Sequence, residues 1–361
     1  GAKAYLTLNS LMLQSDLKKL LRTTNAAAEA GVDAVIAWDF AAIETARQAG
    51  LKVFLSTQMS VANAPALLFF YRNLGIRRFV LARECSLSDL CSIRRSLQRE
   101  LGQKAGEIEL EVFAHGAMCL SISGRCQLSQ FHFGVSANRG TCRQPCRREF
   151  LITETRDGNS FQLGSHSILS PKDLCTLPFL EKLLQAGVAS LKIEGRQRSP
   201  EYVSIVTSAY RQVVDLWFQK PRPPDFVDRF AALKEEQMTR LRQVFHRGFS
   251  SGFYLGRPVN EWSKTGGTQA THRKKHIGEV QKYFKRIGIA EIRLEAGDVA
   301  IGDEIMIQGP TTGVVTARIE SIEADLQRVT KGKKGQVVAV AFPHLVRCHD
   351  IVYRMVPLEE S

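Results

Sequence analysis

Four of the eight cysteines fall within one stretch of 28 residues, where their thiols could share a metal centre. Cys119, Cys126, Cys142 and Cys146 are separated by six, fifteen and three residues. Structural zinc sites usually contain two pairs of cysteines with about two to four residues between the members, and only Cys142 and Cys146 come near that spacing. Four thiolates without an intervening carboxylate suit a [4Fe-4S] cluster. We therefore expect an iron-sulfur cluster, with structural zinc or buried free thiols as alternatives.

The charged residues around these cysteines are all positive. The stretch from Val112 to Arg148 contains no Asp or Glu but five arginines. Nearby cations lower the pKa of thiols and offset the negative charge of a thiolate-ligated cluster. Cations also neutralise phosphates, and we expect Arg139, Arg143 and Arg147 to contact RNA.

A second candidate group stands at the end of an apolar segment. Lys192, Glu194 and Arg196 occupy alternate positions there, and alternate residues of a strand share one face. Together they would act in catalysis by binding an anionic group, or they would form a structural ion-pair cluster. His115 directly follows another predicted strand and is a candidate acid or base, or a hydrogen-bonded loop histidine. Cys175 is either a fifth thiol near the site or a residue packed on a first helix turn.

The charge balance favours a polyanionic partner. Forty-nine Lys and Arg exceed 36 Asp and Glu, so the formal net charge is +13. His246 and Arg247 lie among glycines and aromatic residues, a mixture that can stack bases and contact phosphates. The run Arg273, Lys274 and Lys275 suits a phosphate backbone. The alternative for His246 and Arg247 is a loop whose aromatic residues fill a domain interface. The alternative for the basic run is a solvated linker.

The elements that must position these residues alternate between strand and helix. Short apolar runs at residues 4–8, 34–37, 52–55, 78–81 and 110–114 are separated by helical stretches such as 15–30 and 39–49. After an insertion we expect a strand at 167–169, a helix at 171–186, a strand at 190–193 and a helix at 200–218. Alternation of this kind predicts a parallel sheet, either doubly wound or closed into a (β/α) barrel. We favour an α/β fold with a barrel-like parallel sheet whose first units lie upstream of Gly1.

The end of the chain has a different pattern. A helix is predicted at 230–244, and short strands at 277–283, 286–289, 304–307, 313–322 and 336–341 indicate a small antiparallel β-barrel. We therefore divide the chain into a catalytic domain at 1–225 with a Cys-rich insertion, a helical segment and basic linker at 226–276, and the C-terminal barrel at 277–361.

Composition excludes several classes of protein. No apolar run approaches the ~18 residues of a membrane-spanning helix, so we expect no membrane partner. Eight cysteines in 361 residues are too few for a disulfide scaffold and favour a reducing cytoplasm. The chain starts abruptly, with neither an initiator Met nor a signal-peptide pattern, and we expect that something upstream is missing.

At these motifs the chain resembles the U32 peptidase-like family over nearly its whole length. The segments that carry the resemblance are His115 to Cys119, Ser123 to Cys126, Asn138 to Gly140, Cys142, Gln144 to Arg147, Ser170 to Leu174, Lys192 to Arg196, Ser199-Pro200, His246 to Phe249, Thr57-Gln58 and Asn63. By that resemblance we expect the first strand-helix units of the barrel to lie upstream of Gly1, which agrees with the abrupt start.

The resemblance implies two different activities. The family is named for collagenase-type proteolysis, but other members resemble proteins that hydroxylate a tRNA wobble uridine or an rRNA cytidine, and ubiquinone hydroxylation proteins with a [4Fe-4S] cluster on four cysteines. By resemblance, Cys119, Cys126, Cys142 and Cys146 are the cluster ligands. The tRNA-type members also imply prephenate as a required metabolite and an added C-terminal barrel.

The residues favour hydroxylation over proteolysis. The sequence has no Gly-x-Ser-x-Gly elbow and no His-Glu-x-x-His helix, and it offers four thiols where a thiol protease uses one. Together with the resemblance, which implies the tRNA wobble uridine as substrate, this leads us to expect an enzyme that hydroxylates a tRNA pyrimidine. A U32-type peptidase and a non-catalytic RNA-binding protein are the alternatives.

Overall fold

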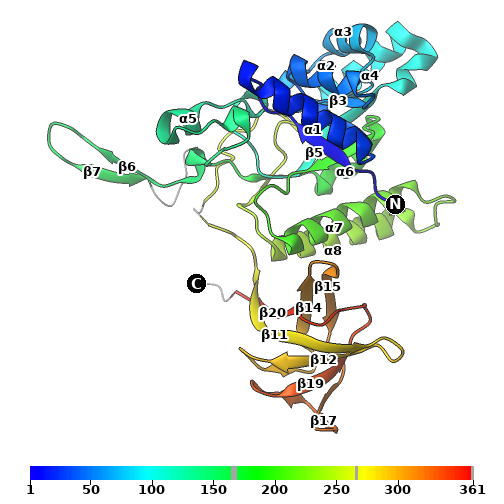
Figure 1. The fold of residues 1–361 in the computed structure, drawn as a ribbon, viewed down its shortest axis with the longest axis vertical. Coiled ribbons are helices and arrows are strands. Elements are labelled where there is room, and N and C mark those ends of the chain that lie inside the picture. Colours follow the sequence, from blue (N-terminus) through cyan, green and yellow to red (C-terminus); the bar gives the residue numbers. More distant parts are fainter. Residues whose placement is uncertain (164–168, 265–266, 359–361) are drawn as a thin grey trace. The chain divides into compact units, whose positions relative to one another are not determined.

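The computed structural model describes residues 1–163, 169–264 and 267–358 (Figure 1). The chain divides into two compact units, each made of two segments. The first unit joins Gly1–Glu194 to His246–Thr268, and the second joins Gly195–Phe245 to Gln269–Ser361. The domain boundaries predicted at 225 and 276 stay predictions.

The first unit is built on a parallel sheet, as the alternating pattern predicts. Its first five strands pair in chain order, and a sixth strand pairs parallel with the fifth: β1 (Tyr5–Leu8), β2 (Ala34–Ala37), β3 (Val53–Leu55), β4 (Arg78–Val80), β5 (Glu109–Gly116) and β9 (Ser190–Ile193). Four helices connect the first five strands: α1 (Leu17–Glu29), α2 (Phe40–Gln48), α3 (Ala64–Leu74) and α4 (Leu87–Leu101). The predicted strand-helix units are therefore confirmed over residues 5–116.

Local signals explain these helices. The Asp39 carboxylate accepts the Ala41 N–H at 2.9 Å and caps α2, and Asn63 caps α3 through the Ala66 N–H at 2.9 Å. α3 ends at Gly75, whose φ of 65° is left-handed and suits glycine. All four residues of β2 are buried, as expected for a parallel strand covered on both faces.

The sheet is mixed at one end, and its closure into a barrel is not confirmed. β8 (Asp173–Cys175) runs antiparallel to the end of β5, and β10 (Phe249–Ser250) runs parallel to β8. Over the described ranges no hydrogen-bonded pairing joins β1 to another strand besides β2. The strand predicted at 167–169 lies largely outside the described residues.

The helix predicted at 171–186 is wrong over its first part. Asp173–Cys175 is a strand because it pairs with β5, opposite His115 and Gly116. A 3₁₀ turn at Leu177–Phe179 contains Pro178, and α6 (Leu180–Gln185) follows it. Cys175 is accordingly buried in a strand rather than packed on a first helix turn.

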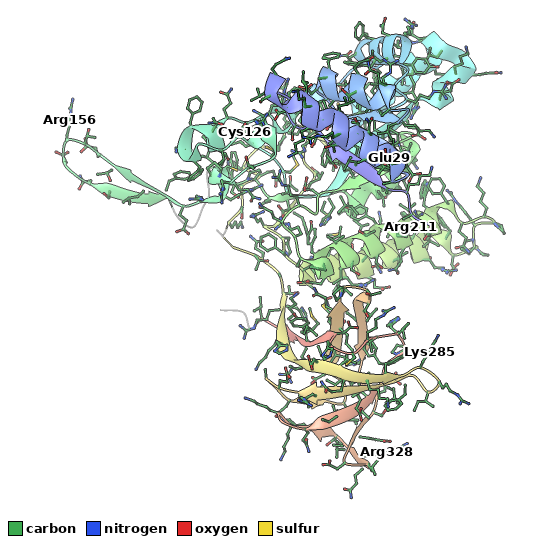
Figure 2. All side chains as sticks on the ribbon, in the orientation of Figure 1. Glu29, Cys126, Arg156, Arg211, Lys285 and Arg328 are labelled. Atoms are coloured by element: carbon green, nitrogen blue, oxygen red, sulfur yellow. The ribbon has the colours of Figure 1, made fainter. Side chains whose placement is uncertain are left out.

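The insertion between β5 and β8 carries the four clustered cysteines. It contains one short helix, α5 (Leu128–Phe133), several 3₁₀ turns, and a hairpin of β6 (Phe150–Thr153) and β7 (Ser160–Leu163). Within the parts of the chain that the structure describes, the hairpin strands pair only with each other. Figure 2 places Arg156 at the hairpin tip and Cys126 beside α5.

The second unit contains a helical pair and an antiparallel sheet. Helix α7 (Pro200–Phe218) has the predicted bounds, and α8 (Phe226–Gln243) begins four residues before the prediction. Trp217, Phe226 and Phe230 lie between these helices, with ring centroids 5.4–6.1 Å apart. No described helix has both the length and the apolar character needed to cross a bilayer.

The predicted antiparallel strands of the C-terminal region are largely confirmed, but closure into a barrel is not. Eight strands pair in the order β15-β14-β20-β11-β12-β19-β16-β17. Their bounds, in chain order, are β11 (His272–Phe284), β12 (Ile289–Leu294), β14 (Glu304–Gly309), β15 (Gly313–Arg318), β16 (Ile322–Ala324), β17 (Gln327–Val329), β19 (Val337–Ala341) and β20 (Ile351–Pro357). The short strands β13 (Val299–Ala300) and β18 (Lys331–Gly332) form a separate pair.

Two details of that sheet differ from the sequence-based expectation. Residues 285–288 form a turn rather than a strand, and β20 was missed although it pairs with both β11 and β14. The core is formed by side chains such as Ile277, Val280 and Val352, which are at most 1% exposed.

Candidate functional site

The four cysteines lie in a loop at the carboxyl end of the parallel sheet. Cys119 comes three residues after β5 ends at Gly116, and Cys126 comes two residues before α5 begins. Cys142 precedes the 3₁₀ turn Pro145–Arg147, which contains Cys146. All four are half-buried and none is in a disulfide.

Contacts with three other strand ends hold this cysteine loop in place. After β1, the Leu11 N–H donates to the Asn138 carbonyl at 2.8 Å. After β3, Ser60 accepts a hydrogen bond from Arg125 at 3.0 Å, and after β4 the Glu84 carboxylate accepts the Ser123 N–H at 3.0 Å. The loop therefore stands where active sites of parallel sheets are found.

Asn138 fixes the backbone at Cys126. Its side-chain oxygen accepts the Cys126 N–H and its amide donates to the Cys126 carbonyl, each at 3.2 Å. The next residue, Arg139, donates to the Asp16 carboxylate at 2.7 and 3.1 Å. This hydrogen bond, with a second from the Leu13 N–H, lowers the pKa of Asp16 to about 2.

Two of the four sulfur atoms accept backbone hydrogen bonds. The Leu128 N–H donates to Cys126 Sγ and the Gln144 N–H donates to Cys142 Sγ, both at 3.4 Å. The buried Ser129 hydroxyl lies 3.9 Å from Cys142 Sγ. Donors of this kind stabilise thiolates and tune the reduction potential of clusters that thiolates ligate.

The Cys146 thiol shares an electrostatic environment with the other three. Burial is the main cause that raises its pKa, and Arg147 acts in the opposite direction. Charges on Cys119, Cys142 and Cys126 also raise this pKa. As the side chains stand, however, no group of three or more His, Cys, Asp or Glu residues in the described ranges converges enough to hold a metal ion.

The loop fits a thiolate-ligated centre in its chemistry. It offers four sulfur donors, backbone N–H groups that point at two of them, and arginines that offset negative charge. The assignment of Cys119, Cys126, Cys142 and Cys146 as cluster ligands stays a prediction.

The three arginines predicted to bind RNA from this loop differ in their surroundings. Arg147 is bonded within the protein, to Ser170 Oγ at 2.6 Å, the Pro171 carbonyl at 2.7 Å and the Met118 carbonyl. Arg139 is paired with Asp16, whereas Arg143 is exposed to solvent. Arg143 is the arginine of the three with the most freedom to reach a phosphate.

His115 is a buried residue of β5 and does not lie in a loop. Its side chain is 2% exposed, and its ring centroid lies 5.6 Å from that of Phe249. The His115 carbonyl accepts the Glu194 N–H at 2.8 Å. A catalytic role for His115 stays a prediction.

Lys192 is paired with a carboxylate that the sequence reasoning missed. Its Nζ donates to Glu111 at 3.2 Å, and Arg78 approaches the other Glu111 oxygen at 3.9 Å. Glu111 is 5% exposed, and a glutamate between the apolar residues Leu110 and Val112 of a strand is the signal that could have revealed it. The grouping of Lys192, Glu194 and Arg196 as one anion-binding trio stays a prediction.

His246 and Arg247 are buried. The His246 ring stacks on Phe249 with centroids 4.4 Å apart, and its Nδ1 accepts the Gly248 N–H at 3.1 Å. Arg247 pairs with buried Asp173 at 3.4 Å and is 9% exposed. Little of either side chain is exposed to contact a phosphate. The predicted contact of His246 and Arg247 with RNA stays a prediction.

The basic run in β11 alternates between two environments. Lys274 donates to Glu201 at 3.0 Å and to Gln308 at 3.3 Å. Arg273 and Lys275 on either side of it are exposed. Lys274 is therefore engaged within the second unit, and its two neighbours keep the surface expected of a phosphate-binding pair.

The fold and the site define a mixed α/β protein with a cysteine-rich loop at the carboxyl end of its parallel sheet. The sequence model of peptidase family U32 matches residues 1–264, which is most of the chain. The chain belongs to peptidase family U32.

Relatives of the chain carry two kinds of name. A protein named collagenase from Porphyromonas gingivalis is 39% identical over 362 residues, covering 100% of this chain and 85% of that protein. The tRNA hydroxylation protein P1 of Bacillus subtilis is 33% identical over 328 residues, covering 89% of this chain and 74% of that protein. A 23S rRNA 5-hydroxycytidine synthase of Escherichia coli is 30% identical over 278 residues, covering 72% of this chain and 40% of that protein.

Proposed function

We propose that the protein is an enzyme that hydroxylates a pyrimidine of tRNA, the wobble uridine, with a [4Fe-4S] cluster held by Cys119, Cys126, Cys142 and Cys146. The observation that carries the proposal is the cysteine loop, in which the Leu128 and Gln144 N–H groups donate to Cys126 and Cys142. Relatives named for tRNA and rRNA hydroxylation support it.

When bound, the cluster would supply one-electron chemistry. The chain's own residues hold the loop and neutralise charge. Asn138 and Glu84 fix its backbone, and the Arg139 and Arg147 side chains tie it to neighbouring segments. Exposed Arg143 is free to bind a phosphate of the RNA.

We include prephenate as the proposed small anionic co-substrate. The Lys192 side chain is 27% exposed, and its ammonium group donates one hydrogen bond to Glu111. A lysine ammonium has three N–H donors, so two more remain for a carboxylate of a bound anion.

Nucleoside analysis tests the proposed function. tRNA from a strain that lacks this gene would be hydrolysed and analysed by mass spectrometry after complementation with the wild type, Cys126→Ser or Cys91→Ser. Cys91 is exposed and stands outside the cysteine loop, which makes it a matched control. We expect hydroxylated uridine with the wild type and Cys91→Ser and its loss with Cys126→Ser. Hydroxylation that persists with Cys126→Ser would overturn the proposal.

Proteolysis is the second candidate because the relative named collagenase matches the whole chain at 39% identity. A peptidase would cleave gelatin, and its activity would survive Cys126→Ser. A non-catalytic RNA-binding protein would instead bind tRNA in a salt-sensitive manner and leave nucleoside composition unchanged in every strain.

A further inference from the structure

Helix α5 carries exposed aromatic rings beside the cysteine loop. Phe131 is 82% exposed and Phe133 is 39% exposed, although phenylalanine is usually buried. The Arg148 guanidinium lies 4.4 Å from the centroid of the Phe133 ring and covers one side of it. Phe131 is therefore the more open of the two rings.

The position of α5 is fixed relative to the cysteines. Ser129, on the first turn of the helix, is fully buried, and its hydroxyl accepts the Arg143 N–H at 3.0 Å. The same hydroxyl lies 3.9 Å from Cys142 Sγ. Phe131 follows Ser129 by two residues on this helix, and its ring faces solvent while the Ser129 hydroxyl faces Cys142.

The positive charges near these rings favour a negatively charged partner. Arg125, Arg143 and Arg148 are exposed, and no carboxylate occurs from Val112 to Arg148. A surface that combines open aromatic rings with arginines binds single-stranded nucleic acid, because bases stack on the rings and phosphates pair with the guanidinium groups. Double-stranded RNA lacks the unstacked bases that this arrangement would need.

We propose that Phe131 is a stacking platform for an unpaired base of RNA, with Arg143 and Arg148 holding the flanking phosphates. This inference rests on the proposed function and extends it by naming a surface of the cysteine-rich insertion that binds the RNA loop. It assigns base stacking to Phe131 and charge neutralisation to the two arginines.

Binding of a fluorescein-labelled RNA stem-loop with a seven-nucleotide loop tests the proposal. The chain, purified anaerobically, would be compared with Phe131→Leu, which removes the ring, and Phe131→Trp, which keeps one. Phe40→Leu is the matched control because Phe40 is 60% exposed in α2. Since Phe131 is mostly solvated, neither substitution disturbs a core.

We expect Phe131→Leu to raise the Kd for the stem-loop by roughly 5- to 150-fold, and Phe131→Trp and Phe40→Leu to bind like the wild type. Arg143→Gln should reduce the slope of log K against log salt concentration by about 0.7. The same RNA annealed to a complementary strand should bind more weakly, and Phe131→Leu should not weaken it further.

Two failures are distinguishable. If the wild type binds the stem-loop and Phe131→Leu binds it equally well, the stacking inference is wrong, while the proposed function stands on its nucleoside test. If the wild type binds neither RNA and nucleosides in cells are unchanged by its loss, both are wrong. Equal affinity for the open and the annealed loop would also overturn the inference.

Discussion

Asn138→Ala tests how far the cysteine loop depends on its side-chain hydrogen bonds. The Asn138 side chain makes two hydrogen bonds to the Cys126 backbone, each at 3.2 Å. A hydrogen bond contributes about 1 kcal/mol net to stability, and water replaces part of it at a half-buried site. We therefore expect the ordered conformation of the loop to lose about 1 to 2 kcal/mol, which lowers the affinity for a bound cluster by roughly 5- to 30-fold.

The assay is the release of iron to a chelator under anaerobic conditions after reconstitution. Asn73→Ala is the matched control, because Asn73 is an exposed residue of α3 whose amide donates to a backbone carbonyl at 2.8 Å. We expect Asn138→Ala to lose iron at lower chelator concentration than the wild type and Asn73→Ala to match the wild type. Equal iron retention by all three proteins would refute the reasoning.

Three further predictions concern charge and packing. Arg139 lowers the pKa of Asp16 to about 2, so their interaction stabilises the fold at pH values above the ordinary pKa of 3.8. This stabilisation is lost as the pH falls toward 2. Arg139→Ala should therefore reduce the resistance to urea unfolding more at pH 7 than at pH 3. Asp173→Ala removes the buried carboxylate that pairs with the Arg247 guanidinium and should lower stability by about 3 kcal/mol in urea unfolding; no change would contradict this. Gly309→Ala would drive a Cβ into Asp350 Oδ1 and should cost about 3 kcal/mol, seen as a lower Tm; an unchanged Tm would exclude the clash.

The parallel sheet was predictable because its signals are local. Short apolar runs alternate with helices that carry their own caps, such as Asn63 before α3 and Gly75 after it. Such features act over a few residues and can be recognised in a single sequence. The same holds for α7, whose N-terminal Pro200 suits the first turn of a helix.

Pairing over long distances was not predictable. Asp173–Cys175 was assigned to a helix because its partner strand, β5, lies some 60 residues earlier in the chain. Strand β20 was missed for the same reason. It is a strand because it pairs with β11 and β14, and these partners lie far from it in the sequence.

The candidate site was predictable in residue types but not in pairings. The clustered cysteines and arginines are visible in the sequence, whereas the partners of Lys192 and Arg247, which are Glu111 and Asp173, come from distant strands. Phe131 was not singled out because an exposed phenylalanine has the same sequence pattern as a buried one.

The most direct test of the account is the iron and sulfide content of the wild-type protein purified anaerobically, measured together with its visible absorbance. The account predicts a brown protein with about four iron and four sulfide ions per chain, lost in Cys126→Ser and retained in Cys91→Ser. A colourless wild type without iron after reconstitution would contradict it.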